Sequence, residues 1–197
     1  MSIAIPTTKE RILDAAEDLM LAKSFHSVGL NEILSAVKVP KGSFYHYFTS
    51  KEQFGVELIR HYVSEATAYK RRFLLTDALD ENPYERLVTY CNGAVTKSLE
   101  CSCQPVCLIT KLCAEVATMS DDMRNEMAKG MRDWCEIYTQ VIEDGQRKSV
   151  IRPNLEPKST AQVLHDLWLG AMQRMMVERN VAPVRNVGAF IRNYLAP

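Results

Sequence analysis

Apolar residues recur along the chain with the spacing of helices, and no stretch alternates as a strand would. In the first such segment they fall at i, i+1, i+4, i+7 and i+8, which is one face of a helix. These residues are Ile12, Leu13, Ala16, Leu19 and Met20. The pattern predicts an all-α fold of about nine helices, without strands or internal repeats.

Residues that cap helices mark where most of these helices begin. Thr7 and Glu10, and later Ser50 and Gln53, have the spacing of a capping box. Asn82-Pro83 and Gln104-Pro105 each place proline at a first helical position. The signals predict helices over about 7–24, 29–37, 41–48, 50–75, 82–99, 104–117, 120–147, 156–179 and from 182 onward.

Composition narrows the class of protein. The 197 residues carry 24 Lys and Arg against 24 Asp and Glu, so any surface for nucleic acid must be local. An apolar share of 47% is enough for a sizeable core. No run approaches the length of a membrane span, and the charged N-terminal segment is unlike a signal peptide. We expect a cytoplasmic protein with no membrane partner.

Two short predicted helices, 29–37 and 41–48, are joined by a tight turn and suggest a helix-turn-helix. A DNA-reading helix presents polar groups from its first turns while an apolar face holds it in place. Phe44 and Phe48 lie four residues apart and can pack inward. Polar groups remain for the DNA grooves and phosphates: Lys41, Ser43, Tyr45, His46, Tyr47 and Lys51. The alternative, a buried core turn, is disfavoured because three polar-tipped rings in a row are hard to bury together.

The run V-P-K-G-S-F-Y-H-Y-F-x-S-K-E-x-F at 39–54 resembles the helix-turn-helix of TetR-type transcriptional repressors. Segments at 107–116, 120–124 and 167–171 resemble the branch that represses N-ethylmaleimide reductase genes. The resemblance covers almost the whole chain. It implies a DNA-binding domain over 1–50, a ligand-sensing and dimerisation domain over 51–197, and a near-palindromic double-stranded operator as partner. The DNA contacts it implies are Ser27, Lys41, Gly42, Ser43, Tyr45, His46, Tyr47 and Lys51.

Two positions depart from the pattern of that family. Gly29 stands where a threonine often caps the second helix and touches a phosphate, which puts this contact in doubt. Lys38 stands where the turn usually has glycine, so we expect a residue with φ > 0 or a turn of another shape.

Four of the six cysteines crowd into thirteen residues: Cys101, Cys103, Cys107 and Cys113. We expect Cys107 in the first turn of the helix opened by Pro105, where unpaired N–H groups favour a thiolate. Lys111, at i+4, could add positive charge. The resemblance implies that the electrophile-sensing cysteine stands at this same position.

Other interpretations of the cysteines stay open. Cys107 could be a small buried apolar side chain. Cys101 and Cys103 are candidates for resolving disulfides, and Cys113 is expected in the core. C-x-C-x3-C offers three thiolates, but no histidine or second pair completes a zinc spacing. No metal and no cofactor are expected.

Two further sets of apolar residues have both structural and functional interpretations. A stripe of methionines at every fourth position is either core filling or the flexible wall of a ligand cavity. The candidate cavity residues are Met123, Met127, Trp134, Tyr138 and Trp168. Two apolar helices end the chain and suggest a four-helix dimer interface formed by Leu164, Leu167, Ala171, Val187, Phe190 and Ile191.

The sequence therefore predicts a homodimeric repressor that leaves its operator when an electrophile or oxidant reacts with Cys107. One alternative is a repressor of the same type with a reversibly bound small-molecule inducer. Another is a thiol-dependent enzyme that acts on electrophiles. No G-x-S-x-G, H-E-x-x-H, P-loop or dinucleotide motif supports an enzyme, and no histidine lies near Cys107 in sequence.

Overall fold

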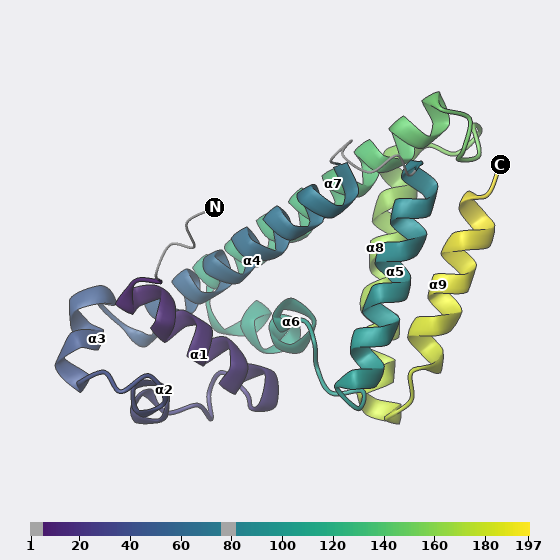
Figure 1. Cartoon of the computed structure of the whole chain (residues 1–197). Coiled ribbons are helices and arrows are strands. Elements are labelled where there is room, and N and C mark those ends of the chain that lie inside the picture. The colour runs from purple at the N-terminus through teal and green to yellow at the C-terminus, as the bar shows by residue number, and fades with distance from the viewer. Residues whose placement is uncertain (1–5, 76–81) are drawn as a thin grey trace. The chain divides into compact units, whose positions relative to one another are not determined.

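The computed structural model describes residues 6–75 and 82–197, and over these ranges it contains nine helices and no strand (Figure 1). This confirms the all-α prediction. The helices are α1 (Thr8–Ala22), α2 (Leu30–Ala36), α3 (Lys41–Tyr47), α4 (Lys51–Leu75), α5 (Pro83–Glu100), α6 (Leu108–Met119), α7 (Asp121–Arg147), α8 (Pro157–Glu178) and α9 (Ala182–Leu195).

The capping signals in the sequence correspond to hydrogen bonds in the structure. Thr7 and Glu10 form both halves of the capping box that opens α1. The Asn82 Oδ1 atom accepts from the Glu85 N–H at 2.8 Å and opens α5. The second box forms only in part. Ser50 Oγ accepts from the Gln53 N–H at 3.0 Å, while Gln53 Oε1 is buried with no hydrogen-bond partner among the described residues.

One helix start was predicted wrongly. The helix expected from Gln104 and Pro105 begins at Leu108, because Gln104 belongs to the turn that closes α5. Its N–H donates to the Cys101 carbonyl at 2.9 Å, and the Cys103 N–H donates to the Ser98 carbonyl at 2.8 Å. Cys107 is therefore the N-cap residue of α6 and not a residue of its first turn.

The described residues divide into two compact units. The first consists of the described part of Met1–Ser64 together with Cys107–Ala128. It holds α1, α2, α3, the start of α4, α6 and the start of α7. The expected division after residue 50 differs from this one, because the segment that carries Cys107 packs in the same unit as the helix-turn-helix.

Aromatic rings form part of the core of the first unit. Phe44, Phe48 and Phe54 lie with ring centroids 4.9–5.4 Å apart and are almost fully buried. Gly55 allows a close approach, since a Cβ atom there would lie 2.6 Å from Met123 Cε and 2.8 Å from Phe25 Cζ. This core holds α3 from behind and leaves its other face to solvent.

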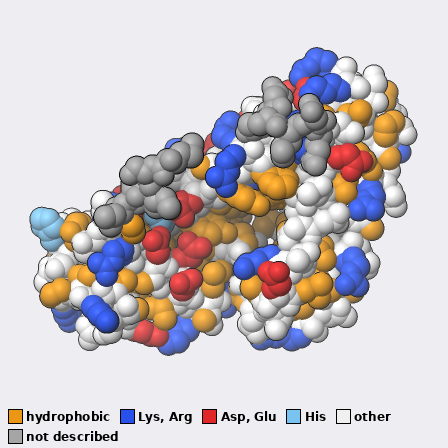
Figure 2. Space-filling model, viewed as in Figure 1, with side chains coloured by type: hydrophobic (Ala, Val, Ile, Leu, Met, Phe, Trp, Pro, Cys, Tyr) orange, Lys and Arg blue, Asp and Glu red, His pale blue; other side chains and the backbone are white. Residues whose placement is uncertain are grey.

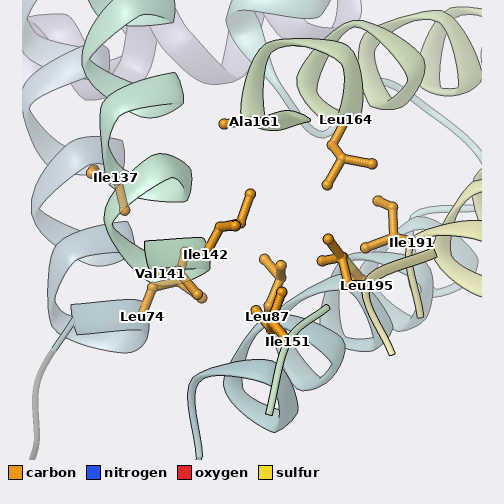
Figure 3. Packing of buried hydrophobic residues seen from close by; sticks show 11 residues of the cluster. Leu74, Leu87, Ile137, Val141, Ile142, Ile151, Ala161, Leu164, Ile191 and Leu195 are labelled. Atoms are coloured by element: carbon orange, nitrogen blue, oxygen red, sulfur yellow. The ribbon is translucent and has the colours of Figure 1, made fainter. Parts of the chain in front are cut away.

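The second unit consists of Glu65–Val106 and Lys129–Pro197. Its helices α5, α8 and α9 run side by side (Figure 1), and α9 contacts both of the others. Leucine and isoleucine side chains from α5, α7, α8 and α9 converge in its core (Figure 3). No helix in the described ranges has the length and hydropathy needed to cross a membrane.

Candidate DNA-binding surface and sensor cysteine

Helix α3 separates its apolar and polar side chains as the sequence predicts. The Phe44 residue is 2% exposed, whereas its neighbour Tyr45 is 60% exposed. The residues predicted to touch DNA are exposed, apart from Ser43 and Tyr47, which are half-buried. They all lie in the first unit, so one compact body carries the whole predicted surface.

Gly42 is not required by the packing of the protein itself. A Cβ atom built there meets nothing within 4 Å, and its φ is not positive. An alanine would therefore fit the free protein. The close approach of a DNA backbone at Gly42, which the resemblance implies, stays a prediction.

The two departures from the family pattern lie on either side of α2, Gly29 before it and Lys38 after it. Lys38 has φ 55°, which confirms the expected positive φ at this non-glycine position. Gly29 is the N-cap of α2 in an extended conformation and offers no capping side chain. The backbone N–H groups in the first turn of α2 could therefore donate hydrogen bonds to a phosphate.

Lys51 has contacts that its sequence position did not reveal. Its Nζ atom donates to the carbonyls of His26 and Val28, each at 3.3 Å, and lies 5.2 Å from the centre of the Phe25 ring. The ammonium therefore fixes the loop between α1 and α2 in the free protein.

Basic and acidic side chains are interspersed on the face seen in Figure 2, in keeping with the zero net charge.

Cys107 is half-buried at the N-terminus of α6, and its own side chain makes no capping bond. The Tyr62 side chain from α4 lies at this helix start instead. Its hydroxyl lies beside the Cys107 thiol and the Leu108 N–H, and burial together with the neighbouring thiol raises the pKa of Tyr62 well above its ordinary value. Sequence reasoning missed Tyr62, because 45 positions separate it from Cys107.

The backbone of Lys111 is close to Cys107 as the i+4 spacing requires. The Lys111 N–H donates to the Cys107 carbonyl at 3.0 Å, and the lysine is half-buried. A charge effect of Lys111 on the thiolate stays a prediction.

The remaining cysteines of the cluster differ in their surroundings. Cys103 is buried among apolar residues of α8 and α9, with φ 58°, and Cys101 is the half-buried C-cap of α5. Both belong to the second unit. Cys113 lies on α6 itself, half-buried, with its Sγ donating to the Thr110 carbonyl at 3.6 Å.

A small apolar cavity of about 30 Å³ lies in the second unit. It is lined by Leu87, Tyr90, Cys91, Tyr138, Leu164, His165, Trp168 and Ile191. Tyr138 and Trp168 are among these lining residues, and their role in binding a ligand stays a prediction. Pockets that bind drug-sized ligands have volumes of about 300–1,000 Å³, so this cavity holds no such ligand without rearrangement.

The other residues predicted for a cavity lie elsewhere. Met123 and Met127 are buried in the first unit, whereas Tyr138 and Trp168 belong to the second. Trp134 Nε1 donates to Thr67 Oγ1 at 2.9 Å, which satisfies its polar group. The methionines at every fourth position are divided between the two units, because α7 begins in the first unit and ends in the second.

The predicted dimer face needs a similar correction. Leu164, Ala171 and Ile191 are buried in the core of the chain itself and leave little side-chain surface for a partner. Val187 is half-buried against the same core. Leu167 and Phe190 stay exposed, at 39% and 47%, and they are the members of the set that a second copy could cover.

Comparison with known proteins agrees with this geometry. Residues 12–58, which contain the helix-turn-helix, match the model of the bacterial regulatory proteins of the tetR family. Residues 83–191 match the tetracyclin repressor-like C-terminal domain. The chain belongs to the TetR family.

Relatives within the TetR family match nearly the full length of the chain. The HTH-type transcriptional repressor NemR of Escherichia coli (strain K12) is 37% identical over 96% of this chain and 94% of its own. The crystal structure of E. coli NemR in its reduced form has a TM-score of 0.87 and 35% identity, covering 96% of this chain and 98% of that one. The HTH-type transcriptional repressor DhaR of Mycobacterium sp. (strain GP1) is 29% identical over 89% of this chain and 86% of its own.

Proposed function

We propose that this TetR-family protein is a homodimeric transcriptional repressor that leaves its operator DNA when an electrophile or oxidant modifies Cys107. The observation that carries the proposal is the position of this thiol. It lies half-buried at the start of α6, next to the Tyr62 hydroxyl, and in the same compact unit as the helix-turn-helix.

The chemistry proposed for Cys107 is an addition. The thiolate attacks the carbon–carbon double bond of a maleimide or quinone, a sulfur–carbon bond forms, and the adjacent carbon takes a proton from water. A helix N-terminus favours the anion that this reaction requires. The adduct needs room beside Tyr62, at a helix start where Leu108 and Ile109 are fully buried, and packed contacts tend to switch between discrete arrangements.

DNA binding is assigned to α3 and its flanks. Tyr45, His46 and Lys41 are exposed beside a buried aromatic cluster, which suits contacts with base edges and phosphates. Similarity to the transcriptional repressors NemR and DhaR supports a repressor. The exposed Leu167 and Phe190 supply apolar surface for a second copy, and a two-fold dimer would place two α3 helices on one near-palindromic site.

The test uses a labelled duplex that the reduced protein selects from a random library. Fluorescence anisotropy is followed while N-ethylmaleimide is added. Wild-type protein is expected to release the duplex, and Cys107→Ser is expected to stay bound at the same dose. Cys113→Ser, which removes another half-buried thiol of α6, is the matched control and is expected to release DNA like the wild type. Release of Cys107→Ser at the wild-type dose would overturn the proposal.

A further inference from the structure

The carboxylate of Glu115 joins α6 to the loop between α1 and α2. It accepts hydrogen bonds from the Phe25 N–H at 3.1 Å and from the His26 N–H at 2.9 Å. The Glu115 side chain is only 27% exposed. Hydrogen bonds from backbone N–H groups to a carboxylate are about twice as strong as neutral ones. This contact spans 90 positions of sequence within one compact unit.

The loop that Glu115 holds is fixed from its other side as well. Lys51 donates to the carbonyls of His26 and Val28, and the Phe25 ring is buried next to Gly55. The N–H groups of the loop thus face a carboxylate and its carbonyls face an ammonium. The same loop carries Ser27, an expected phosphate contact, and leads into the first turn of α2.

Glu115 and Cys107 belong to the same short helix. Cys107 caps α6, and Glu115 follows about two turns later. Between them Leu108, Ile109 and Leu112 are fully buried. A displaced α6 start therefore moves the packed helix as a whole, because a close-packed core transmits strain instead of absorbing it.

We propose that Glu115 is the coupling residue that carries a change at Cys107 into the DNA-binding loop, an inference that rests on the proposed function. In the reduced protein, Glu115 holds residues 24–28 where Ser27 and the start of α2 meet phosphates. When an adduct shifts α6, Glu115 takes the loop with it or releases its N–H groups. Either event changes the fit to DNA. Without Glu115, modification of Cys107 no longer changes DNA affinity.

The experiment compares wild type, Glu115→Ala, Glu115→Gln and the control Asp122→Ala, which removes an exposed carboxylate of the same unit. Dissociation constants for the selected duplex are measured before and after treatment with N-ethylmaleimide. Peptide mass spectrometry records the adduct at Cys107, and thermal unfolding checks the fold. The coupling role is tested by the ratio of the dissociation constant after treatment to the dissociation constant before it.

We expect a ratio of about tenfold or more for wild type and Asp122→Ala, and less than about threefold for Glu115→Ala with the same Cys107 adduct. Glu115→Gln keeps one acceptor oxygen and is expected in between, and it decides the matter if the alanine variant does not fold. A wild-type ratio in the folded Glu115 variant would overturn the coupling role. An unchanged affinity of wild-type protein carrying the Cys107 adduct would overturn the proposed function itself.

Discussion

The hydroxyl of Tyr62 on α4 lies beside the thiol of Cys107, which stands at the start of α6. The same hydroxyl also lies near the Leu108 N–H, one of the N–H groups that a helix start leaves without an internal partner. Tyr62 therefore lies where a capping side chain lies at other helix starts. It also places a hydrogen-bond donor beside a sulfur that must become an anion in order to react.

Replacing Tyr62 by phenylalanine tests this arrangement. Loss of the donor is expected to slow alkylation of Cys107 about three- to tenfold, since hydrogen bonds to charged groups contribute about 1.5–3 kcal/mol and sulfur is a weak acceptor. The free energy of unfolding is expected to fall by about 1 kcal/mol at most, because a half-buried polar group beside the start of α6 is lost. The measurement is the rate of adduct formation at limiting N-ethylmaleimide, with Tyr69→Phe as the control. Equal rates for Tyr62→Phe and wild type would show that the hydroxyl has no part in reactivity.

Tyr45→Ala tests the DNA-binding surface. Tyr45 is exposed, so its truncation is expected to leave the thermal midpoint nearly unchanged and to weaken binding to the selected duplex at least about fivefold. Phe44→Ala, one position earlier, is the contrast, because loss of this buried ring costs about 3–5 kcal/mol of stability. Anisotropy titrations and thermal melts measure both effects. Undiminished DNA affinity of Tyr45→Ala would remove Tyr45 from the interface.

Leu167→Asp tests the proposed dimer face. A carboxylate on an apolar face between two copies is expected to weaken the dimer by more than about tenfold and to weaken DNA binding with it. Leu99→Asp, at an exposed leucine on α5, is the matched control and is expected to stay dimeric. Sedimentation velocity at micromolar protein concentration measures the oligomeric state. A Leu167→Asp protein that sediments at the same rate as the wild type would show that the two copies meet elsewhere.

The surroundings of His165 predict that the stability of the folded protein depends on pH. Burial lowers its pKa, the Lys70 ammonium acts in the same direction, and Asp166 acts against them. The folded state therefore resists protonation at His165, so stability is lost as the pH falls below the unfolded value of about 6.5. Between about pH 7.5 and pH 5.5, wild type is expected to lose more thermal stability than His165→Gln. His46→Gln, at an exposed histidine, should follow the wild type, and parallel curves for wild type and His165→Gln would contradict the assignment.

Local chemistry made the helices predictable from the sequence. Thr7, Asn82, Ser120 and Glu156 each accept backbone N–H groups at a helix start, and these signals lie within three residues of their partners. The start of α6 was missed because Gln104 and Pro105 look like a helix start, while Gln104 in fact closes the turn after α5. A proline signal is ambiguous where one helix has just ended.

Contacts between distant segments were not predictable in the same way. Tyr62 meets Cys107, and Glu115 meets Phe25 and His26, across 45 and about 90 positions that no periodicity relates. The apolar faces of α8 and α9 were found, but the pattern could not tell which residues fill the chain's own core. Leu164 and Ile191 do so, while Leu167 and Phe190 point out, since an apolar helix can bury residues on more than one side.

Adduct formation at Cys107 and release of DNA should be followed in the same sample over time. Protein bound to the labelled duplex is mixed with N-ethylmaleimide, anisotropy records release, and quenched aliquots give the modified fraction of each cysteine peptide. We predict that the release curve follows the Cys107 adduct curve and is complete at one adduct per chain. Complete release while the Cys107 peptide is still unmodified would contradict the proposed function, and so would full modification of Cys107 with the duplex still bound.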